Sequence, residues 1–284
     1  MKHFLLPIFL LISQINLQAL QANTVAGLPL YYYQEKHFTN FGDFLSKKLM
    51  ERIVGGNIRI AKINERKFLC IGSILILART HDVLWGTGMN AKRMDNYHFT
   101  DLDIRAVRGP LTRNFIMSRF GIDCPEVYGD PGLLVPYFFP EFKKPQNPAN
   151  EYVIVPHYKD NDLFPKEEYP NVVYPTERWD IVIKKILNSK FVISGSLHGL
   201  IIAEAFGIPA RYLRVSEYEP LFKYQDYYLG TNRLDFKYAT SVDEALELGG
   251  EPPFECDLEK LYEAFPFEFW PNANFKIPDF TKKI

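Results

Sequence analysis

The chain has 284 residues and a mass of 33.0 kDa, which predicts two domains, with a single large domain as the alternative. Hydrophobic residues make up 47% and charged residues 24%, a composition that excludes disordered, collagenous and coiled-coil proteins. Lys and Arg number 33 against 34 Asp and Glu, so the net charge of -1 provides no global basic field for nucleic acid. Aromatic residues reach 15%, and they can either fill cores or stack on sugars.

The first 22 residues differ from the rest of the chain. Lys2 precedes an apolar run over residues 4–12, and small and polar residues follow as far as Ala22. This pattern is typical of a secretory signal, and the apolar run is shorter than the roughly 20 residues of a membrane span. We therefore predict a signal-like or anchoring segment over residues 1–23. A misassigned start or a peripheral apolar tail is the alternative.

The three cysteines are far apart and form no C-x-x-C pair, which argues against a disulfide framework and a structural zinc site.

Short apolar runs alternate with helical patterns along the first half of the chain. The pattern predicts strands at 28–33, 83–85 and 104–107, and a strand or strand-to-helix passage at 68–77. It predicts helices at 44–54, ended by Gly55-Gly56, and at 110–120, opened by Pro110 and ended by Gly121.

The same alternation restarts after residues 141–150, which are rich in Pro, Lys and Asn and form the best linker candidate. Strands are predicted at 152–156, 172–174, 191–194 and 211–215, and helices at 178–188, 200–206 and 258–265. Strands separated by helices predict an α/β protein with parallel sheets covered on both faces. We expect lobes at 24–140 and 151–250, and a C-terminal extension at 251–284 that packs on one of them.

The strongest candidate site follows the predicted strand at 191–194. Ser194, Ser196 and Gly199 allow a ligand to approach the backbone, and the helix that follows offers free N–H groups to an anion. His198 at this position can donate or accept a proton near neutral pH, although a histidine can also serve a purely structural role there. Glu204, inside the helix, either supports the site or pairs with a cation.

A second candidate is Arg108, which ends a strand immediately before a helix N-terminus. A guanidinium beside free amides suits a phosphate or a carboxylate. Arg105 is a weaker candidate, because it points to the opposite face of an alternating strand. The alternative for Arg105 and Arg113 is a surface salt bridge.

Two further loops follow predicted strands. In the first, Asp43 can cap the next helix, while Asn40 and Gly42 can contact a substrate. In the second, Gly86 and Gly88 mark a strand end that is far from a dinucleotide-binding fingerprint.

Asp130 lies in a Gly-Asp-Pro-Gly turn; turn chemistry explains it, so it is at most a candidate for substrate binding. His157 ends the first strand of the second half, as His198 follows a later one, so the two can face each other across a cleft. The chain has no phosphate-loop motif, no H-E-x-x-H motif and no nucleophile elbow, which makes serine hydrolysis a poor hypothesis.

Six motifs in a fixed order resemble the polysaccharide pyruvyl transferase family over roughly residues 30–215. They are Asn40-Phe-Gly-Asp43, Trp85-Gly-Thr-Gly88, Val107-Arg-Gly-Pro110, Tyr128-Gly-Asp-Pro131, Ile154-Val-Pro-His-Tyr158 and Ser194-Gly-Ser-Leu-His-Gly199 with Gly207-Ile-Pro209. The resemblance implies two Rossmann-like lobes similar to GT-B glycosyltransferases, with the active site in the interdomain cleft. It also implies transfer of a pyruvyl group from phosphoenolpyruvate to sugar hydroxyls, giving a ketal on a cell-surface polysaccharide, without a metal or organic cofactor.

The resemblance also implies roles for particular residues. His198 is expected to be the general acid, and His157 to assist binding of the phosphate or the acceptor. Arg108, with Arg105, is expected to bind phosphoenolpyruvate, while Trp85 and Tyr158 are candidates to stack on the sugar.

The partners expected from the resemblance are phosphoenolpyruvate and an oligosaccharide or polysaccharide, either free or lipid-linked at a membrane, with no nucleic acid. The resemblance places the protein at the cytoplasmic face of the membrane, whereas a working signal peptide would place it in the periplasm or outside the cell. Two other functions stay open: a nucleotide-sugar glycosyltransferase of the GT-B class and a non-catalytic glycan-binding protein.

Overall fold

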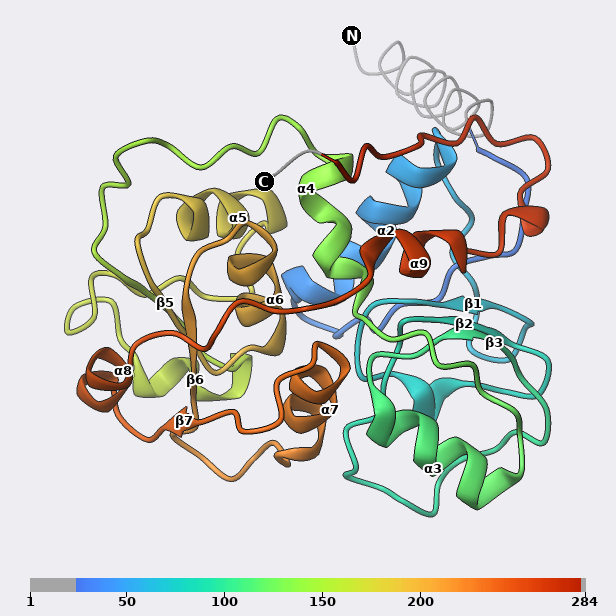
Figure 1. Ribbon diagram of the computed structural model, residues 1–284, viewed down its shortest axis with the longest axis horizontal. Helices are drawn as coiled ribbons and strands as arrows, with labels where there is room; N and C mark the ends of the chain where they lie inside the picture. The colour runs from blue at the N-terminus through green and yellow to red at the C-terminus, as the bar shows by residue number, and fades with distance from the viewer. Residues whose placement is uncertain (1–23, 282–284) are drawn as a thin grey trace, which may run out of the picture.

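The computed structural model describes residues 24–281, so the predicted signal-like segment lies outside the described part. Two parallel sheets lie side by side (Figure 1). The first has three strands in the order β1 (Phe68–Leu69), β2 (Val83–Trp85) and β3 (Asp103–Ala106). The second has four, in the order β4 (Val153–Val155), β5 (Val192–Ser194), β6 (Ala210–Leu213) and β7 (Tyr238–Ala239). The predicted α/β class with parallel sheets is therefore confirmed.

Helices connect and cover these strands. The larger ones are α2 (Phe41–Val54), α3 (Pro110–Phe120), α5 (Trp179–Leu187), α6 (Leu197–Ala205), α7 (Phe222–Gly230) and α8 (Val242–Leu248). Shorter helices are α4 (Val135–Phe138) and α9 (Leu258–Glu263), and 3-10 turns cover Leu75–Leu77, Pro131–Leu134, Tyr158–Leu163 and Phe267–Phe269. Gly55 and Gly121 end α2 and α3 as predicted, in the left-handed conformation with φ of 74° and 65°.

Two segments predicted as strands do not form regular strands in the structure, because each makes only isolated β-bridges. In segment 28–33, Leu30 bridges Ile60 and Phe68, and Pro29 beside it lacks the N–H that would extend a ladder. In segment 172–174, Val172 alone bridges Ile154. Prolines at both ends of that segment limit its pairing.

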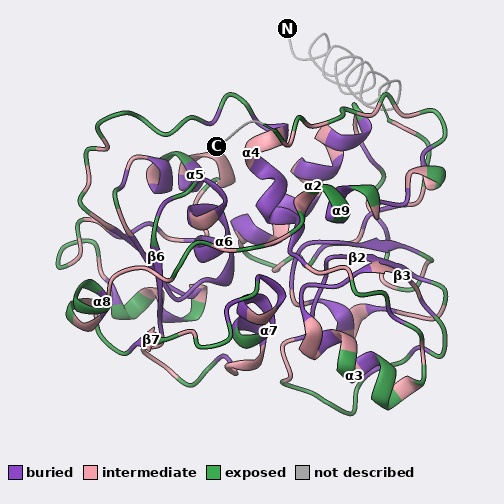
Figure 2. Cartoon of the chain, in the orientation of Figure 1, coloured by how far each residue is buried: buried purple, intermediate pink, exposed green. Residues whose placement is uncertain are grey.

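Two helices begin earlier than the sequence predicted. Helix α2 starts at Phe41 because Asn40, rather than Asp43, is its N-cap and accepts a hydrogen bond from the Gly42 N–H at 3.0 Å. Helix α6 starts at Leu197, so His198 and Gly199 lie in its first turn instead of the preceding loop. Figure 2 shows α6 buried along most of its length.

The largest hydrophobic core joins the two halves of the sequence. It contains residues of α2 such as Leu45 and Leu49 together with residues of α5 and α6 such as Ile183 and Leu200. In Figure 1 helices α2, α4 and α6 lie between the two sheets. The sheets are thus connected by a continuous apolar core, which fixes the ends of their strands relative to one another.

The C-terminal segment contacts both halves, whereas we expected it to pack on one. At the second sheet, the Glu251 N–H donates to the Ala210 carbonyl at 3.0 Å. At the first sheet, the Trp85 indole N–H donates to the Leu261 carbonyl at 2.7 Å. The segment crosses from α8 to α9 in Figure 1 and ties the two sheets together.

Candidate functional site

A cavity of about 540 Å³ is shared by the loops that follow strands of both sheets. Residues predicted from the sequence line it, among them Asn40, Asp43, His157, Ser196 and His198. The first two come from the start of α2, and the other three follow β4 and β5. His157 and His198, which we expected to face each other across a cleft, both line this cavity.

His198 is held by the turn between β5 and α6. The Ser194 hydroxyl lies 2.9 Å from the Val155 carbonyl and accepts a hydrogen bond from the Ser196 N–H at 3.1 Å, which fixes this turn. A side chain at Gly199 would overlap the Ser194 hydroxyl. Ser194 and Gly199 therefore fix the conformation of the turn, while Ser196 and His198 line the cavity.

Burial controls the protonation of His198. Its pKa is lowered to about 3 by burial, with the charges of Lys223 and Arg108 acting in the same direction. The Nε2 atom of His198 is buried without a hydrogen-bond partner and lies 3.8 Å from Oδ2 of Asp130, which also lacks one. Arg108 Nε is a third buried polar atom of this kind. Unpartnered buried polar atoms are rare, and their clustering beside a cavity indicates a ligand or water site.

Gly42 packs against the imidazole of His198. A Cβ atom added at Gly42 would overlap the ring at Nδ1, and the ring edge also contacts Phe41 at 6.5 Å between centroids. The glycine at this position is thus explained by close packing on His198, and no substrate contact is required.

We expect Gly42→Ala to displace the His198 ring and to lower activity at least about tenfold, because small misplacements of reacting groups reduce rates strongly. Gly121→Ala is the matched control, since a Cβ there meets nothing within 4 Å, although its φ of 65° carries strain. Steady-state rates of both variants measure the effect on activity, and thermal unfolding verifies that both variants are folded. Equal rates for the Gly42 variant and wild type would exclude this packing role.

Arg108 follows β3 and is completely buried. Its guanidinium donates from Nη1 to the Ser73 hydroxyl and from Nη2 to the Met89 carbonyl, both at 2.7 Å. Asp226 of α7 lies 3.1 Å from Nη2. Ser73 lines the cavity, so Arg108 lies directly behind the wall of the cavity and not on its surface.

The two glycines after β2 serve packing. A Cβ at Gly88 would lie 2.5 Å from Cζ of Arg108, so this glycine makes room for the guanidinium. Gly86 has a φ of 80° and packs against Pro131. Neither glycine lines the cavity, so their predicted substrate contact is replaced by this role in the wall.

Two predicted site residues lie away from the cavity. Arg105 pairs with Asp103, with 2.9 Å between Nη2 and Oδ2, and with Glu268, as expected for a side chain on the other face of β3. Glu204 forms a buried ion pair with Arg233 at 2.8 Å, which is the cation-pairing alternative. These placements correct the predicted substrate-binding roles of Arg105 and Glu204.

Trp85 was also expected at the sugar, but it is fully buried in the core beneath the C-terminal segment. Tyr158 does line the cavity, and its hydroxyl lies 3.1 Å from the Glu35 carboxylate.

Two carboxyl groups near His198 have raised pKa values. Burial raises the pKa of Asp43 to about 7, with Glu35 and Asp130 adding to the effect and Lys223 opposing it. Burial raises the pKa of Asp130 to about 6, against a hydrogen bond from the Gly132 N–H. Asp43 lines the cavity, and a group that titrates near neutral pH in a cavity wall is typical of a functional site.

The sequence reasoning missed a charged cluster formed around Glu219. Its carboxylate pairs with Lys223 at 2.8 Å and with Lys92, and lies 3.5 Å from His157 Nε2. Burial would raise the pKa of Glu219, but Lys223 and Lys92 outweigh it and hold that pKa below its usual value. Burial lowers the pKa of Lys223 in spite of Glu219. The cluster places two ammonium groups and one carboxylate on the cavity wall.

A periodic signal for α7, which carries Lys223, was present in the sequence. Leu221, Tyr224 and Tyr228 follow helical spacing after Pro220, and both tyrosines are buried. Nothing in that spacing indicates that Lys223 faces a cavity lined mainly by residues far earlier in the chain.

The buried neutral imidazoles predict a pH effect on stability. His198 has a pKa of about 3 when folded and 6.5 as its reference value, so only the unfolded chain gains a proton there as the pH falls below 6.5. Wild type should therefore lose about 2 kcal/mol more than His198→Gln between pH 7 and pH 5. Asp43 and Asp130 titrate in both proteins, so their effects largely cancel in this comparison. Urea unfolding of both proteins at pH 7 and pH 5 measures this difference. Equal losses of unfolding free energy in wild type and His198→Gln would contradict a buried neutral His198.

No helix within residues 24–281 is long and apolar enough to cross a membrane, and no group of three or more His, Cys, Asp or Glu in that range is arranged as a metal site.

These features define an α/β protein with a polar cavity shared by two parallel sheets. The family model for polysaccharide pyruvyl transferase matches residues 40–217. The chain belongs to the polysaccharide pyruvyl transferase family, which makes it a pyruvyltransferase by membership.

The chain is also similar to individual proteins. The chain is 30% identical over 207 residues to the succinoglycan biosynthesis protein ExoV of Rhizobium meliloti, covering 69% of this chain and 63% of that protein. It is 29% identical over 226 residues to the uncharacterized protein L143 of Acanthamoeba polyphaga mimivirus, covering 74% and 78%. A crystal structure described as a functional uncharacterized protein, KP1_0663 of Klebsiella pneumoniae, aligns with a TM-score of 0.45 and 11% identity over 81% of this chain and 98% of that one.

Proposed function

We propose that the protein transfers the pyruvyl group of phosphoenolpyruvate to two hydroxyls of a polysaccharide sugar, forming a pyruvate ketal. The reaction would take place in the 540 Å³ cavity, as the interdomain cleft of a GT-B-like pair of lobes at 24–140 and 151–250. One observation carries the proposal: unpartnered buried atoms of Arg108, His198 and Asp130 lie beside a cavity that also contains the ammonium group of Lys223.

The donor carries a phosphate and a carboxylate, so its site needs cations and free N–H groups. Arg108 and Lys223 supply two cations, and Ser196 at the start of α6 makes no side-chain cap, which leaves N–H groups of the first turn available to an anion. Arg108 Nε is free to donate a hydrogen bond. Access of the donor to this guanidinium would require Ser73 to give way or to share the contact.

The chemistry needs one proton and the displacement of one phosphate. The first acceptor hydroxyl adds to C2 of the enol while C3 takes a proton, which gives a methyl group and a tetrahedral carbon that still bears phosphate. The second hydroxyl then adds to C2 as the C–O bond to phosphate breaks, and inorganic phosphate leaves with the electron pair. Of the two protons lost by the hydroxyls, one balances the proton added at C3 and the other is carried away by the released phosphate, so no oxidant or reductant is needed.

His198 is proposed to supply the proton at C3. Burial and two neighbouring cations lower the pKa of the His198 imidazole and so favour its neutral form. A bound donor brings negative charge next to Nε2, which favours the protonated ring and so prepares it as an acid. Asp43, with a pKa raised to about 7, provides a second proton carrier in the same wall.

The acceptor is proposed to lie along the outer part of the cavity. Asn90, Asn96 and Tyr158 line it there and offer amides and an aromatic ring, which suit sugar hydroxyls and sugar faces. The relative named for succinoglycan biosynthesis supports a polysaccharide acceptor. The proposal includes a lipid-linked acceptor, which would bring the protein to a membrane.

The test is to incubate the purified protein with phosphoenolpyruvate and a panel of oligosaccharides, and to measure released phosphate and a ketal methyl signal by NMR. Phosphate and ketal in equal amounts, dependent on the acceptor, are expected. Tight binding of a nucleoside diphosphate without binding of phosphoenolpyruvate would instead favour a GT-B glycosyltransferase. Glycan binding that is unchanged in His198→Ala, without phosphate release, would favour a glycan-binding protein.

A further inference from the structure

The buried carboxylate of Asp226 connects α7 to the strand end that carries Arg108. It accepts hydrogen bonds from the Thr112 N–H at 2.9 Å and the Thr112 hydroxyl at 2.6 Å, and it lies 3.1 Å from Nη2 of Arg108. The side chains of Asp226 and Arg108 are both fully buried. The carboxylate thus reaches from the second half of the chain into the first turn of α3.

Close backbone packing fixes this contact. A Cβ atom at Gly109 would overlap the Asp226 carbonyl oxygen, and a Cβ atom at Gly230 would overlap the Arg108 carbonyl oxygen. Both glycines therefore allow α7 to press directly against the turn between β3 and α3. Because the backbones touch on both sides, the Asp226 side chain cannot slide relative to Arg108 without a shift of the whole helix.

We infer that Asp226 is a positioning residue that orients the Arg108 guanidinium toward the donor, an inference that rests on the proposed function. The Met89 carbonyl accepts a hydrogen bond from Nη2, Asp226 lies 3.1 Å from the same atom, and the Ser73 hydroxyl accepts a hydrogen bond from Nη1. The N–H of Nε has no partner and is left for the phosphate or carboxylate of the donor. Because the guanidinium is planar, the contacts at Nη1 and Nη2 fix the direction in which this N–H points.

The same helix places the other cation. Lys223 lies three residues before Asp226 on α7 and reaches the cavity, while Asp226 holds Arg108 behind it. One rigid helix therefore sets the separation between the ammonium and the guanidinium. A dianionic donor with two charged ends requires such a fixed separation.

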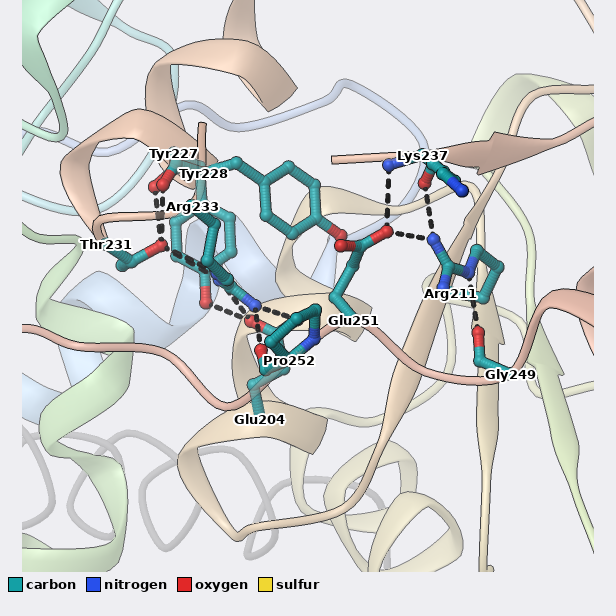
Figure 3. A network of polar contacts seen from close by, with 10 residues as sticks. All are labelled: Glu204, Arg211, Tyr227, Tyr228, Thr231, Arg233, Lys237, Gly249, Glu251 and Pro252. Carbon is teal, nitrogen blue, oxygen red and sulfur yellow. Dashed lines mark hydrogen bonds and ion pairs between the residues drawn. The ribbon is translucent and has the colours of Figure 1, made fainter. Parts of the chain in front are cut away.

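A second buried ion pair nearby provides a matched control. Glu204 of α6 pairs with Arg233, which follows α7, and the Tyr227 hydroxyl also donates to Glu204 (Figure 3). Arg233 and Tyr227 are buried, and the side chain of Glu204 is 7% exposed. None of the three lines the 540 Å³ cavity. Loss of this pair should lower stability without moving Arg108.

The experiment compares Asp226→Asn with Glu204→Gln. Asparagine keeps the shape of the side chain but removes the charge that faces Arg108. We expect the KM for phosphoenolpyruvate to rise about 10- to 100-fold in Asp226→Asn, with the acceptor KM unchanged. Glu204→Gln should lower the Tm to a similar degree and leave the donor KM at the wild-type value. Donor KM values that rise equally in both variants would show a general stability effect and overturn the inference.

Two further measurements keep the inference testable. If Asp226→Asn does not fold, Thr112→Val removes one donor to the carboxylate and should raise the donor KM by about threefold; an unchanged value would overturn the inference. In an Arg108→Lys background, Asp226→Asn should add little to the donor KM, because the two act as a unit. Failure of wild type to release phosphate would overturn the proposed function, whereas phosphate release with a wild-type donor KM in Asp226→Asn would overturn only the role of Asp226.

Discussion

Replacing His198 by glutamine should lower kcat for phosphate release by about 10²- to 10⁴-fold, the usual contribution of a general acid. Glutamine fills a similar volume and can still donate a hydrogen bond, so the fold and the binding of the donor should persist. It cannot transfer a proton to carbon, which is the step assigned to the unpartnered Nε2. Rates at saturating donor and acceptor, with circular dichroism to verify the fold, measure the effect.

The control for this prediction is His81→Gln. His81 is exposed, pairs with Asp101 at 2.9 Å and lies outside the cavity, so its replacement should leave the rate unchanged. A His198→Gln enzyme that keeps kcat within about threefold of wild type would remove His198 as the acid. Asp43 would then become the leading candidate, because its pKa is raised to about 7 in the same wall.

Replacing Arg108 by alanine should raise the donor KM by at least about 100-fold and reduce stability by about 3–5 kcal/mol. The loss of binding follows from removal of the cation proposed to hold the donor. The loss of stability follows because Asp226 would be left as a buried carboxylate without its counterion. Calorimetric titration with phosphoenolpyruvate, at a temperature where both proteins are folded, measures the first effect, and urea unfolding measures the second.

Arg113→Ala, in the helix that follows Arg108, is the matched control. Arg113 donates to the Cys124 carbonyl at 2.8 Å and lies 3.4 Å from Glu126, which is mostly exposed. Its replacement should change neither donor affinity nor stability by more than about 1 kcal/mol. Equal losses of donor affinity in the two variants would show that Arg108 has no special role in binding the donor.

The sequence predicted the parts of the fold that depend on local signals. Glycines after α2 and α3, and Pro110 at the start of α3, locate these helix ends correctly because they act through their own backbone conformation. The strand at 83–85 is confirmed at its exact bounds, as a short apolar run between turn residues. Strands at 28–33 and 172–174 are wrong because regular pairing depends on distant neighbours that the local pattern does not contain.

The candidate site was predictable where a residue follows a strand directly. His157 and His198 reach the cavity for that reason, since strand ends of parallel sheets meet at one edge. The burial of Arg108 could not be predicted, because it depends on Asp226 of α7. Glu219 and Lys223 are only four residues apart, but the contact of Glu219 with Lys92 could not be predicted either. Partners more than 100 residues apart in sequence leave no local signal.

The C-terminal segment hydrogen-bonds to both sheets, so it determines how much of the chain a minimal enzyme needs. The family region stops at residue 217, yet α7, with Lys223 and Asp226, and the stretch that caps Trp85 all come later. A fragment trimmed to the recognisable motifs would keep His198 and Arg108 but would expose the Trp85 side of the core and leave the guanidinium without its carboxylate. We therefore expect both stable folding and the proposed reaction to require residues beyond the region 40–217 that the family model matches.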